Sequence, residues 1–582
     1  MSNKRPDKAL PSVIPNMEEW PIYLLSEDRQ NFIREIEAHT LERLTSKSPS
    51  AVSDMISKTI FRERNRIKED PWKVDPPQEK LFWKRIGRKH VGNALDTTSK
   101  EQITQSNDEV LKKIIHRYAE EIVGTFRIKT FKFARRFLYF FFTRLLNTAA
   151  LRSVQGLWRK KHQLNDKLVI KGEVESIRSL MKKGTVVLVP THFSNLDSIM
   201  IGYAMDAFVG LPSFSYGAGL NLYNSGYVAY FMNRLGAYRI DRRKKNAVYL
   251  ETLKSMSMLS IKRGVNSLFF PGGTRSRSGH LEKKLKLGLL GTAVEAQRRI
   301  YQEGGEGKVF IVPLVLGYHF VLEAEFLIEQ HLRNIGKEQY LQTQDASKKP
   351  FRIFKFAWRV LSQGNNITLS FGKPMDVLGN PVNADGQSYH HGNQVKVREY
   401  FMDKAGIINA DLQREAQYTD LLGDRIVERF HKDNVVLSSH LVAFAAFKLI
   451  EYQNPTLDLY GILRLPVEDY VFPKPVLKKI ITMLKERLII MEVNNQIQLS
   501  EQIHLDINDL LKDGIKHLGN FHVNNPLRFD NKERIVSDSF KVLYYYHNRL
   551  DNYYLERFIV WEGIDRQPSI LEEDLWHKGA RP

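Results

Sequence analysis

The sequence predicts an α/β fold, in which a mostly buried mixed sheet is flanked by helices and by further helical domains on both sides. Between Lys167 and Val377, short apolar runs alternate with longer stretches whose apolar residues recur at helical spacing. Both flanks are mostly helical in pattern, and 582 residues allow several domains and a large core. We divide the chain into an N-terminal helical domain at 1–125, a basic aromatic segment at 126–166, the α/β domain at 167–385 and a mostly helical C-terminal domain at 386–582.

The first 125 residues are polar and highly charged. Arg29 to Leu44 and Gln102 to Ile122 carry apolar residues at helical spacing, and Pro71, Pro76 and Pro77 interrupt the pattern between them. No cluster of residue types that would carry chemistry occurs here. We expect a packing or regulatory role for this region.

The segment from Phe126 to His162 contains ten lysines or arginines and no aspartate or glutamate. One row of apolar residues follows a three-four spacing: Phe131, Ala134, Leu138, Phe141 and Leu145. An aromatic face beside a basic face is typical of a helix in an anionic membrane interface, and a core helix with solvated arginines is the alternative. The candidate membrane-contact residues are Lys129, Lys132, Arg135, Arg136, Phe137 and Phe141.

The α/β region contains four strand-like runs and three clear helical stretches. The strands are expected at Val186–Val189, Ser267–Phe270, Phe310–Leu316 and Ile367–Phe371. The helices are expected at Ser198–Phe208, Asn246–Arg263 and Leu287–Tyr301. Residues 378–394 are typical of a loop, and Leu488–Leu499 could form a hairpin that turns at Asn494-Asn495.

The composition limits the possible partners. The formal net charge of +21 favours an anionic partner such as a membrane surface, nucleic acid, or a phosphorylated or acidic-carrier substrate. The absence of cysteine excludes disulfides, thiolate metal sites and a cysteine nucleophile. Residues 1–8 lead into no apolar core and no run of 18 apolar residues occurs, so we expect neither a signal peptide nor a membrane-spanning helix.

A histidine and an aspartate lie five positions apart in Pro190-Thr-His192-Phe-Ser-Asn-Leu-Asp197, directly after a predicted strand. The two side chains can meet if His192 ends the strand and Asp197 lies in the first helical turn. Asp197 would then hold the imidazole tautomer, while the other ring nitrogen takes a proton from a hydroxyl. The alternative is structural, with Ser194 as helix N-cap and Asp197 as its capping partner.

A glycine-rich loop, Phe269-Phe-Pro-Gly-Gly-Thr-Arg-Ser-Arg-Ser-Gly279, follows the next predicted strand. Its glycines allow close backbone approach, and exposed amides beside two arginines are suited to an anion. The candidate anion-binding residues in it are Gly273, Thr274, Arg275, Ser276 and Arg277. A basic stretch, Gly236–Lys245, contains Arg239 and Arg242, and Val312-Pro-Leu-Val315 begins another strand.

In this order, the four clusters resemble the glycerolipid acyltransferase superfamily, over about residues 180–320. Thr191-His192 to Asp197 matches its H-x-x-x-x-D block, and Gly236–Arg242, Phe270–Gly279 and Ile311–Leu314 resemble the next three. Arg275-Ser-Arg-Ser-Gly279, together with the long flanking regions, looks most like the membrane-bound glycerol-3-phosphate 1-O-acyltransferases. The stretch Leu543–Arg549 is weakly similar to that branch as well.

The sequence departs from the family at one position of the third block. A glutamate usually precedes the glycine there, and this chain has Gly272. The carboxylate that would contact a polar acceptor is therefore missing at this position. The departure bears on the identity of the acceptor more than on the reaction.

The resemblance implies that His192, oriented by Asp197, deprotonates an acceptor hydroxyl as it attacks an acyl thioester. Arg239, Arg242, Arg275 and Arg277 would bind the acceptor phosphate. Acyl-CoA or acyl-carrier protein would be the donor substrate, with no cofactor and no metal. We expect a peripheral or monotopic protein on the cytoplasmic face of the cell membrane, in contact with anionic phospholipid.

Other functions remain open at this stage. The acceptor could be dihydroxyacetone phosphate, lysophosphatidate or another lysolipid, or the protein could be a non-enzymatic scaffold on anionic lipid. A nucleic-acid binder is disfavoured, because the sequence contains no recognised module and its aromatic residues are too contiguous for a base-stacking platform.

Overall fold

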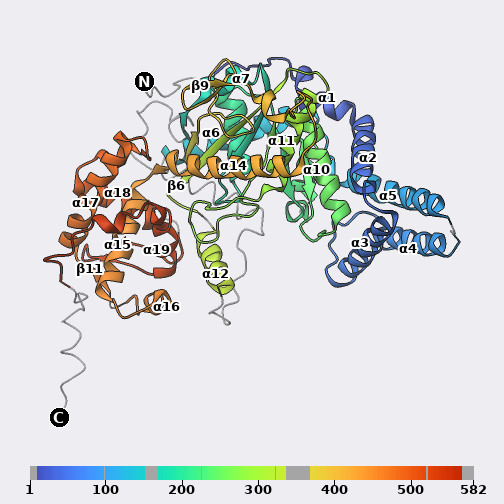
Figure 1. The fold of residues 1–582 in the computed structure, drawn as a ribbon. Coiled ribbons are helices and arrows are strands. Elements are labelled where there is room, and N and C mark those ends of the chain that lie inside the picture. Colours follow the sequence, from blue (N-terminus) through green and yellow to red (C-terminus); the bar gives the residue numbers. More distant parts are fainter. Residues whose placement is uncertain are drawn as a thin grey trace, which may run out of the picture.

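The computed structural model describes residues 10–96, 99–150, 168–224, 226–321, 323–335, 367–468, 470–519 and 522–565. An α/β domain lies between an N-terminal group of helices and a C-terminal group (Figure 1). All three regions share one connected hydrophobic core, which extends from Phe32 to Ile564. The predicted fold class is therefore confirmed: a mixed central sheet is flanked by helices, with helical regions before and after it.

The central sheet has seven strands in the order β1-β7-β6-β2-β5-β3-β4. Their bounds are β1 Leu168–Gly172, β2 Gly184–Pro190, β3 Ser215–Gly219, β4 Ala237–Ile240, β5 Ser267–Leu268, β6 Lys308–Tyr318 and β7 Ile367–Phe371. Only the β6–β7 pair is antiparallel among the described strands of this sheet, and the other pairs are parallel. Strand β2 pairs with β6 and with β5, so the segments that follow β2 and β5 leave the same edge of the sheet.

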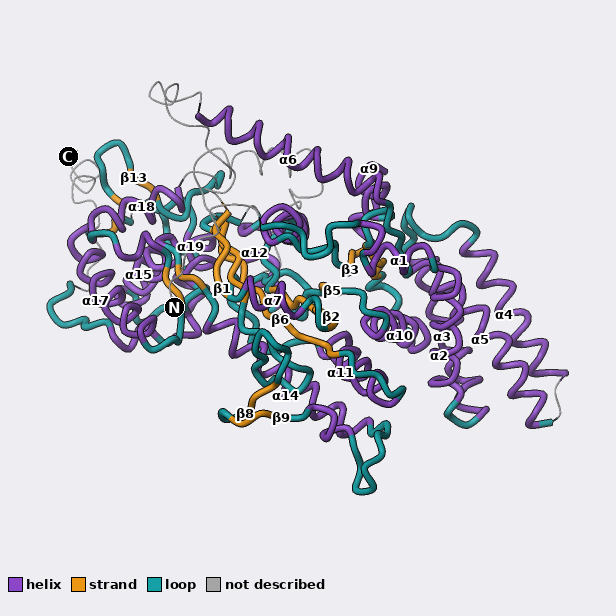
Figure 2. Tube along the Cα trace, turned by 90° about the horizontal axis from the view of Figure 1, so that it is seen from above, coloured by secondary structure: helices purple, strands orange, loops and turns teal. Residues whose placement is uncertain are grey.

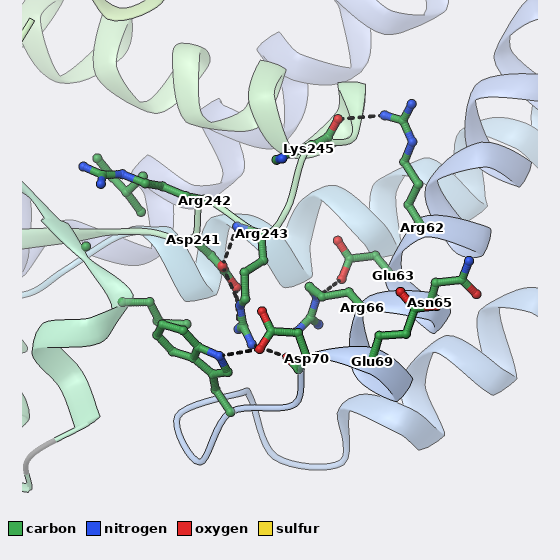
Figure 3. A pocket seen from close by; sticks show the side chains of 14 residues that line it. Arg62, Glu63, Asn65, Arg66, Glu69, Asp70, Asp241, Arg242, Arg243 and Lys245 are labelled. Atoms are coloured by element: carbon green, nitrogen blue, oxygen red, sulfur yellow. Dashed lines mark hydrogen bonds and ion pairs between the residues drawn. The ribbon is translucent and has the colours of Figure 1, made fainter. Parts of the chain in front are cut away.

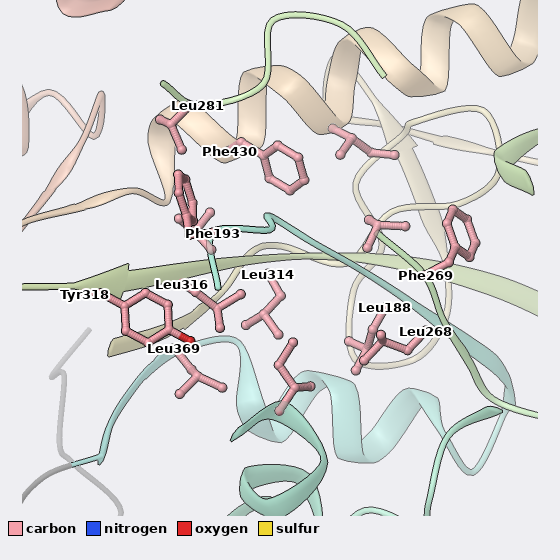
Figure 4. Packing of buried hydrophobic residues seen from close by; sticks show 14 of the residues in the cluster. Leu188, Phe193, Leu268, Phe269, Leu281, Leu314, Leu316, Tyr318, Leu369 and Phe430 are labelled. Carbon is pink, nitrogen blue, oxygen red and sulfur yellow. The ribbon is translucent and has the colours of Figure 1, made fainter. Parts of the chain in front are cut away.

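Helices cover the sheet because its strands are apolar on both faces. The helices of this region are α7 Val174–Leu180, α8 Asp197–Ala204, α9 Gly226–Met232, α10 Ala247–Lys262, α11 Leu287–Gln302, α12 Ala324–Asn334 and α14 Leu412–Lys432. Figure 4 shows Leu188 and Leu314 from the paired strands β2 and β6, with Phe193 and Phe430 nearby. All four side chains are buried, so the segment after β2 begins on a rigid base.

The N-terminal helices pack mainly on α10. They are α1 Pro21–Glu27, α2 Arg29–Thr45, α3 Pro49–Glu69, α4 Glu79–Asp96 and α5 Lys100–Ile122. A buried charge network joins them: Arg66 pairs with Glu63 at 2.8 Å and with Glu79 at 2.7 Å. Lys244, from the segment after β4, reaches Glu121 on the neighbouring α5, so the network ties this region to the α/β domain.

Helix α6 (Ile128–Ala150) extends away from the body of the molecule (Figure 2). Phe131, Ala134 and Leu138 are partly buried, so the described part of the three-four row faces the protein and not solvent. For this part of the row the structure agrees with the alternative of a core-facing helix with solvated arginines, because the row lies over α8 and β3. The opposite face carries the exposed rings of Phe133, Phe137 and Phe140.

The basic residues of α6 also divide between the two faces. Lys129, Lys132 and Arg136 are exposed, whereas Arg135 pairs with Asp206 at 3.1 Å. The side chain of Phe141 and residues 151–166 lie outside the described part of the chain. Among the helices that are described, none is long and apolar enough to cross a bilayer.

The C-terminal region contains α15 Ser438–Gln453, α16 Leu459–Ile462, α17 Lys474–Val493, α18 Ile507–Gly519 and α19 Phe540–His547. Its strands are short: β8 Ser388–His390 with β9 Asn393–Val395, β10 Val435–Val436 with β12 Gln498–Leu499, and β11 Val471–Phe472 with β14 Ile535–Val536 and β13 Arg528–Phe529. The hairpin expected at Leu488–Leu499 is wrong. Asn495, at φ +55°, ends helix α17 instead, and the chain then pairs with β10 in parallel.

Candidate active site

The imidazole of His192 and the carboxylate of Asp197 are in direct contact. His192 follows the end of β2, and Asp197 is the first residue of α8. The distance from Nδ1 of His192 to Oδ2 of Asp197 is 2.7 Å. Since a carboxylate accepts this bond, the ring proton lies on Nδ1 and leaves Nε2 as a proton acceptor. His192 is partly exposed, so Nε2 lies where a ligand can reach it.

Asp197 is fully buried, and several donors hold its position. Oδ2 also accepts the backbone N–H groups of Phe193, at 2.7 Å, and Ser194, at 3.0 Å. Oδ1 accepts the hydroxyl of Tyr318, at the end of β6, at 2.6 Å. These bonds replace the water that a buried carboxylate loses, and they fix its orientation toward the imidazole.

The expected Ser194–Asp197 capping pair is formed only in part, through the bond from the Ser194 N–H to the Asp197 carboxylate. The N-cap of α8 is Leu196, and Ser194 lies two residues before it, within the turn that follows β2. The Ser194 hydroxyl accepts Leu196 N–H at 3.3 Å and donates to Glu323 at 3.1 Å. Asp197 therefore holds both the turn that follows β2 and the imidazole of His192, so the structural contact and the contact with the histidine occur together.

The glycine-rich loop packs directly against the histidine. The ring of Phe270 stacks on the imidazole of His192 with 4.0 Å between ring centres. The N–H of Ser276 donates to the carbonyl of His192 at 2.7 Å. Gly273 has φ +75°, a conformation that favours glycine, and it turns the loop together with the partly exposed Thr274. The first and third sequence clusters thus form one surface.

Three arginines of the predicted set lie close to one another. Burial lowers the pKa of the Arg242 guanidinium, and the charges of Arg275 and Arg277 lower it further. Arg275 also pairs with Glu323 at 3.1 Å, so part of its charge is compensated. Within the described residues neither Arg242 nor Arg277 forms an ion pair. Such a cluster of like charges is suited to an anionic ligand.

Arg239 does not join this cluster through any contact in the described structure. Its guanidinium donates to the side-chain carbonyl of Asn233 at 2.8 Å and lies over the ring of Tyr223, 4.6 Å from its centre. These contacts hold Arg239 on strand β4 beside α9. Its predicted role in binding phosphate therefore has less geometric support than that of Arg242.

The structure adds two residues that the sequence did not indicate. Glu323 is buried after β6 and accepts from Ser194, from the N–H of Asn195 at 3.2 Å and from Arg275, so it joins the first and third clusters. Burial raises the pKa of its carboxyl. Tyr318 fixes Asp197 from the same side. Both lie more than a hundred residues from the histidine, and no local spacing marks them.

A large polar cleft opens beside the arginine cluster (Figure 3). Its volume is about 980 Å³, and it lies between α3 and the segments that follow β3 and β4. Arg62 donates to the backbone carbonyl of Lys245 at 2.7 Å across the cleft. In Figure 3, Arg242 points away from the paired charges around Arg66 and Asp70. The cleft gives a charged ligand a path toward Arg242.

A second, apolar cavity of about 140 Å³ lies under helix α6. Phe131 and Leu138 of α6 line it from one side, and Phe214 and Tyr216 line it from the sheet. Ser198 and Ile199 of α8 line it as well, directly after Asp197. The cavity therefore adjoins the first turn of α8, the helix that begins at Asp197.

A comparison with known protein families agrees with this geometry. A family model described as Acyltransferase matches residues 171–317. This range includes the histidine, the aspartate, the glycine-rich loop and Arg242. The match supports the glycerolipid acyltransferase superfamily and an acyltransferase enzyme.

Proposed function

We propose that this protein transfers a fatty acyl group from an acyl thioester to the sn-1 hydroxyl of glycerol-3-phosphate, the first step of phospholipid synthesis. The observation that carries the proposal is the contact between His192 and Asp197, because it leaves Nε2 as a base at the partly exposed face of the site. General-base help of this kind contributes roughly 10²–10⁴ in rate.

The reaction needs only one proton acceptor. Nε2 of His192 takes the hydroxyl proton as the acceptor oxygen attacks the thioester carbonyl. The new C–O ester bond forms, the C–S bond breaks, and the imidazolium returns the proton to the leaving thiolate. No acyl-enzyme is required, which suits a chain without cysteine.

The phosphate of the acceptor would bind to Arg242, Arg275 and Arg277. The mutual effect of their charges on Arg242 supports this assignment, because a dianion would relieve the repulsion that the protein leaves in place. A planar guanidinium also matches phosphate oxygens better than an ammonium group does. The acyl chain would lie toward the apolar cavity beside α8.

Contact with a membrane would occur through α6. Its exposed aromatic face continues onto α9, where the ring of Phe231 stacks on Phe133 with 6.0 Å between ring centres and Tyr227 is 87% exposed. Basic residues flank these rings: Lys129, Lys132, Arg136 and Arg234. Aromatic bulk beside positive charge fits an anionic leaflet, so we propose a peripheral protein on the cytoplasmic face.

A different acceptor is the second candidate, and Gly272 is the observation that favours it. Dihydroxyacetone phosphate or lysophosphatidate would still use His192 and the arginines. A scaffold that binds anionic lipid without chemistry would use α6 alone. The donor would be acyl-CoA or acyl-carrier protein, and either could approach through the polar cleft.

A transfer assay on purified protein tests the proposal. Radiolabelled glycerol-3-phosphate is offered with acyl-CoA and, separately, with acyl-carrier protein, and dihydroxyacetone phosphate and lysophosphatidate are offered as competing acceptors. We expect a lysophospholipid product from glycerol-3-phosphate, and none with the His192→Ala variant. Preference for another acceptor would replace glycerol-3-phosphate as the proposed substrate. Binding to liposomes without transfer to any acceptor would support the non-enzymatic lipid-binding scaffold instead.

Sedimentation with anionic liposomes tests the membrane surface. Replacing Lys129, Lys132 and Arg136 with glutamine, with Arg135 retained because it pairs with Asp206, should shift the protein toward the soluble fraction. Each of these charges contributes about 1 kcal/mol near an anionic leaflet, less at high salt. The control replaces three exposed lysines elsewhere: Lys47, Lys68 and Lys404. Equal sedimentation of the two variants would show that another surface makes the contact.

A further inference from the structure

A carboxylate from another part of the chain lies beside Gly272. A Cβ atom built at Gly272 would lie 3.0 Å from Oε1 of Glu282 and 3.1 Å from its Cγ. These distances are tighter than ordinary contacts, so the space next to position 272 is already filled. The filling group is of the same kind as the glutamate that the third sequence block lacks at position 272.

Glu282 also contacts the segment that carries the histidine. Its Oε1 accepts the backbone N–H of His192 at 3.4 Å. Its Oε2 is buried and has no hydrogen-bond partner among the described residues. Asp197 binds the ring of His192, and Glu282 binds its main chain, so two carboxylates hold this residue from different sides.

Arg549 supplies the opposite charge. Its guanidinium is buried, lies over the ring of Phe193 at 4.2 Å from the ring centre and donates to the carbonyl of Leu316 at 2.7 Å. Its charge stabilises the ionised form of Glu282 without a direct ion pair among the described contacts, whereas Asp197 opposes ionisation. The C-terminal region therefore contributes to the electrostatics around His192.

We propose that Glu282 is a positioning residue that takes over, from the loop before α11, the place of the carboxylate missing at Gly272. It would hold the main chain of His192 and the glycine-rich loop in register. The inference rests on the proposed function for its effect on rate. It also has a structural consequence: a carboxylate fits at 272 or at 282, but not at both.

The protonation behaviour of Glu282 agrees with a confined site. Burial is the main cause that raises the pKa of its carboxyl to about 7, against hydrogen bonds from the backbone and the charge of Arg549. The side chain of Lys286 lies near Gly273 in the same loop. A second carboxylate at 272 would add like charge to a group that burial already makes hard to ionise.

A four-variant cycle tests the exchange. The proteins are wild type, Glu282→Ala, Gly272→Glu and the double variant, compared by kcat and by the KM for glycerol-3-phosphate. We expect each single change to lower kcat about tenfold, with a smaller change in KM, and the double variant to recover to within about threefold of wild type. A double variant no better than the worse single variant would overturn the proposal.

Two further variants separate charge from shape. Gly272→Ala adds only the Cβ, and the flexible carboxylate can yield, so we expect a smaller loss than with Gly272→Glu. Glu282→Gln keeps an acceptor for the N–H of His192 and should retain more activity than Glu282→Ala. Equal losses for Gln and Ala would contradict a role through that bond.

The cycle is also measured by thermal unfolding and by the NMR-detected titration of His192. These readouts do not need acyl transfer. If wild type proves inactive but the double variant restores the unfolding midpoint and the His192 titration, the proposed function fails and the positioning role stands. If wild type is active but the cycle shows no recovery in any readout, the positioning role fails alone.

Discussion

The two halves of the candidate active site differ in how far the protein satisfies their charges. Around Asp197, hydrogen bonds come from the histidine ring, two backbone amides and a tyrosine, all within 3.0 Å. Around Arg242, the neighbouring charges are the like charges of Arg275 and Arg277, and burial adds to the cost. The charge of Asp197 is therefore satisfied by hydrogen bonds without a ligand, whereas the charge of Arg242 is electrostatically unfavourable where it lies.

This difference indicates which groups are arranged for position and which for binding. A satisfied carboxylate holds the base in one orientation, so little reorganisation is needed during reaction. A cluster of arginines whose charge is compensated only in part, through the pair of Arg275 with Glu323, gains most when an anion binds. Removing a side chain from one half should therefore affect activity and stability in different proportions from removing a side chain from the other.

The largest effect is expected for His192→Ala. Loss of the base should lower kcat by at least about a hundredfold, while circular dichroism and the unfolding midpoint stay close to wild type. The matched control is His390→Ala, at an exposed histidine far along the chain. Turnover close to normal in the His192 variant would exclude it as the base.

Asp197→Asn should be milder in rate and more severe in stability. The amide retains much of the shape but cannot accept all of the hydrogen bonds that converge on the buried carboxylate. We expect a lower kcat than wild type, higher than that of His192→Ala, with a lower unfolding midpoint. An unfolding midpoint equal to that of wild type would contradict the conclusion that the hydrogen bonds to Asp197 stabilise this half of the site.

Arg242→Ala should show the opposite combination. The KM for a phosphorylated acceptor should rise about 10–100-fold, because a charge-assisted contact contributes roughly 1.5–3 kcal/mol. The unfolding midpoint should not fall, since burial and two like charges already oppose the charged form of Arg242. Steady-state kinetics and calorimetry check the two parts.

The neighbouring Arg243→Ala is the matched control for this prediction. Arg243 is paired with Asp241 at 2.7 Å and also contacts Asp75, so its loss should lower stability and leave the KM nearly unchanged. If both arginine variants behave alike, the contrast between a strained and a compensated guanidinium has no functional meaning.

Tyr318→Phe should have a smaller effect on the first half. It removes the hydroxyl bonded to Oδ1 of Asp197, and one such bond to a charged acceptor contributes roughly 1.5–3 kcal/mol. We expect a lower unfolding midpoint and a kcat reduced only severalfold, because the bond to the imidazole remains. A loss as large as that of His192→Ala would mean that the hydroxyl acts in the reaction itself.

The smallest effect is a pH dependence at Glu282. The folded protein holds this proton more tightly than the unfolded chain, since the pKa rises from 4.5 to about 7. The stability that comes from this group is present at low pH and is lost as pH rises through that range. Glu282→Gln cannot ionise, so its unfolding midpoint relative to wild type should increase between about pH 5 and pH 7.5. A constant difference across this range would contradict the raised pKa.

The sequence by itself determined the features that depend on neighbouring residues. Alternating apolar runs predicted β2, β5, β6 and β7 of the central sheet but not β1, β3 and β4, and helix Asn246–Arg263 corresponds to α10 with its two caps. The apolar run before them and their five-residue spacing placed His192 at a strand end and Asp197 in the first helical turn. These signals are local, because side-chain periodicity and chain connectivity determine them.

Tertiary packing decided the rest. Glu282 contacts the histidine, and Tyr318, Glu323 and Arg549 contact the residues that follow it; no spacing in the sequence connects these four with it. The sequence left open whether the three-four row of α6 faces a membrane or the core, because both faces of the helix carry aromatic residues, and only the position of the row over α8 and β3 distinguishes them. The turn at Asn495 was assigned wrongly because the same residue type can end a helix or form a hairpin, and only the pairing with β10 distinguishes them.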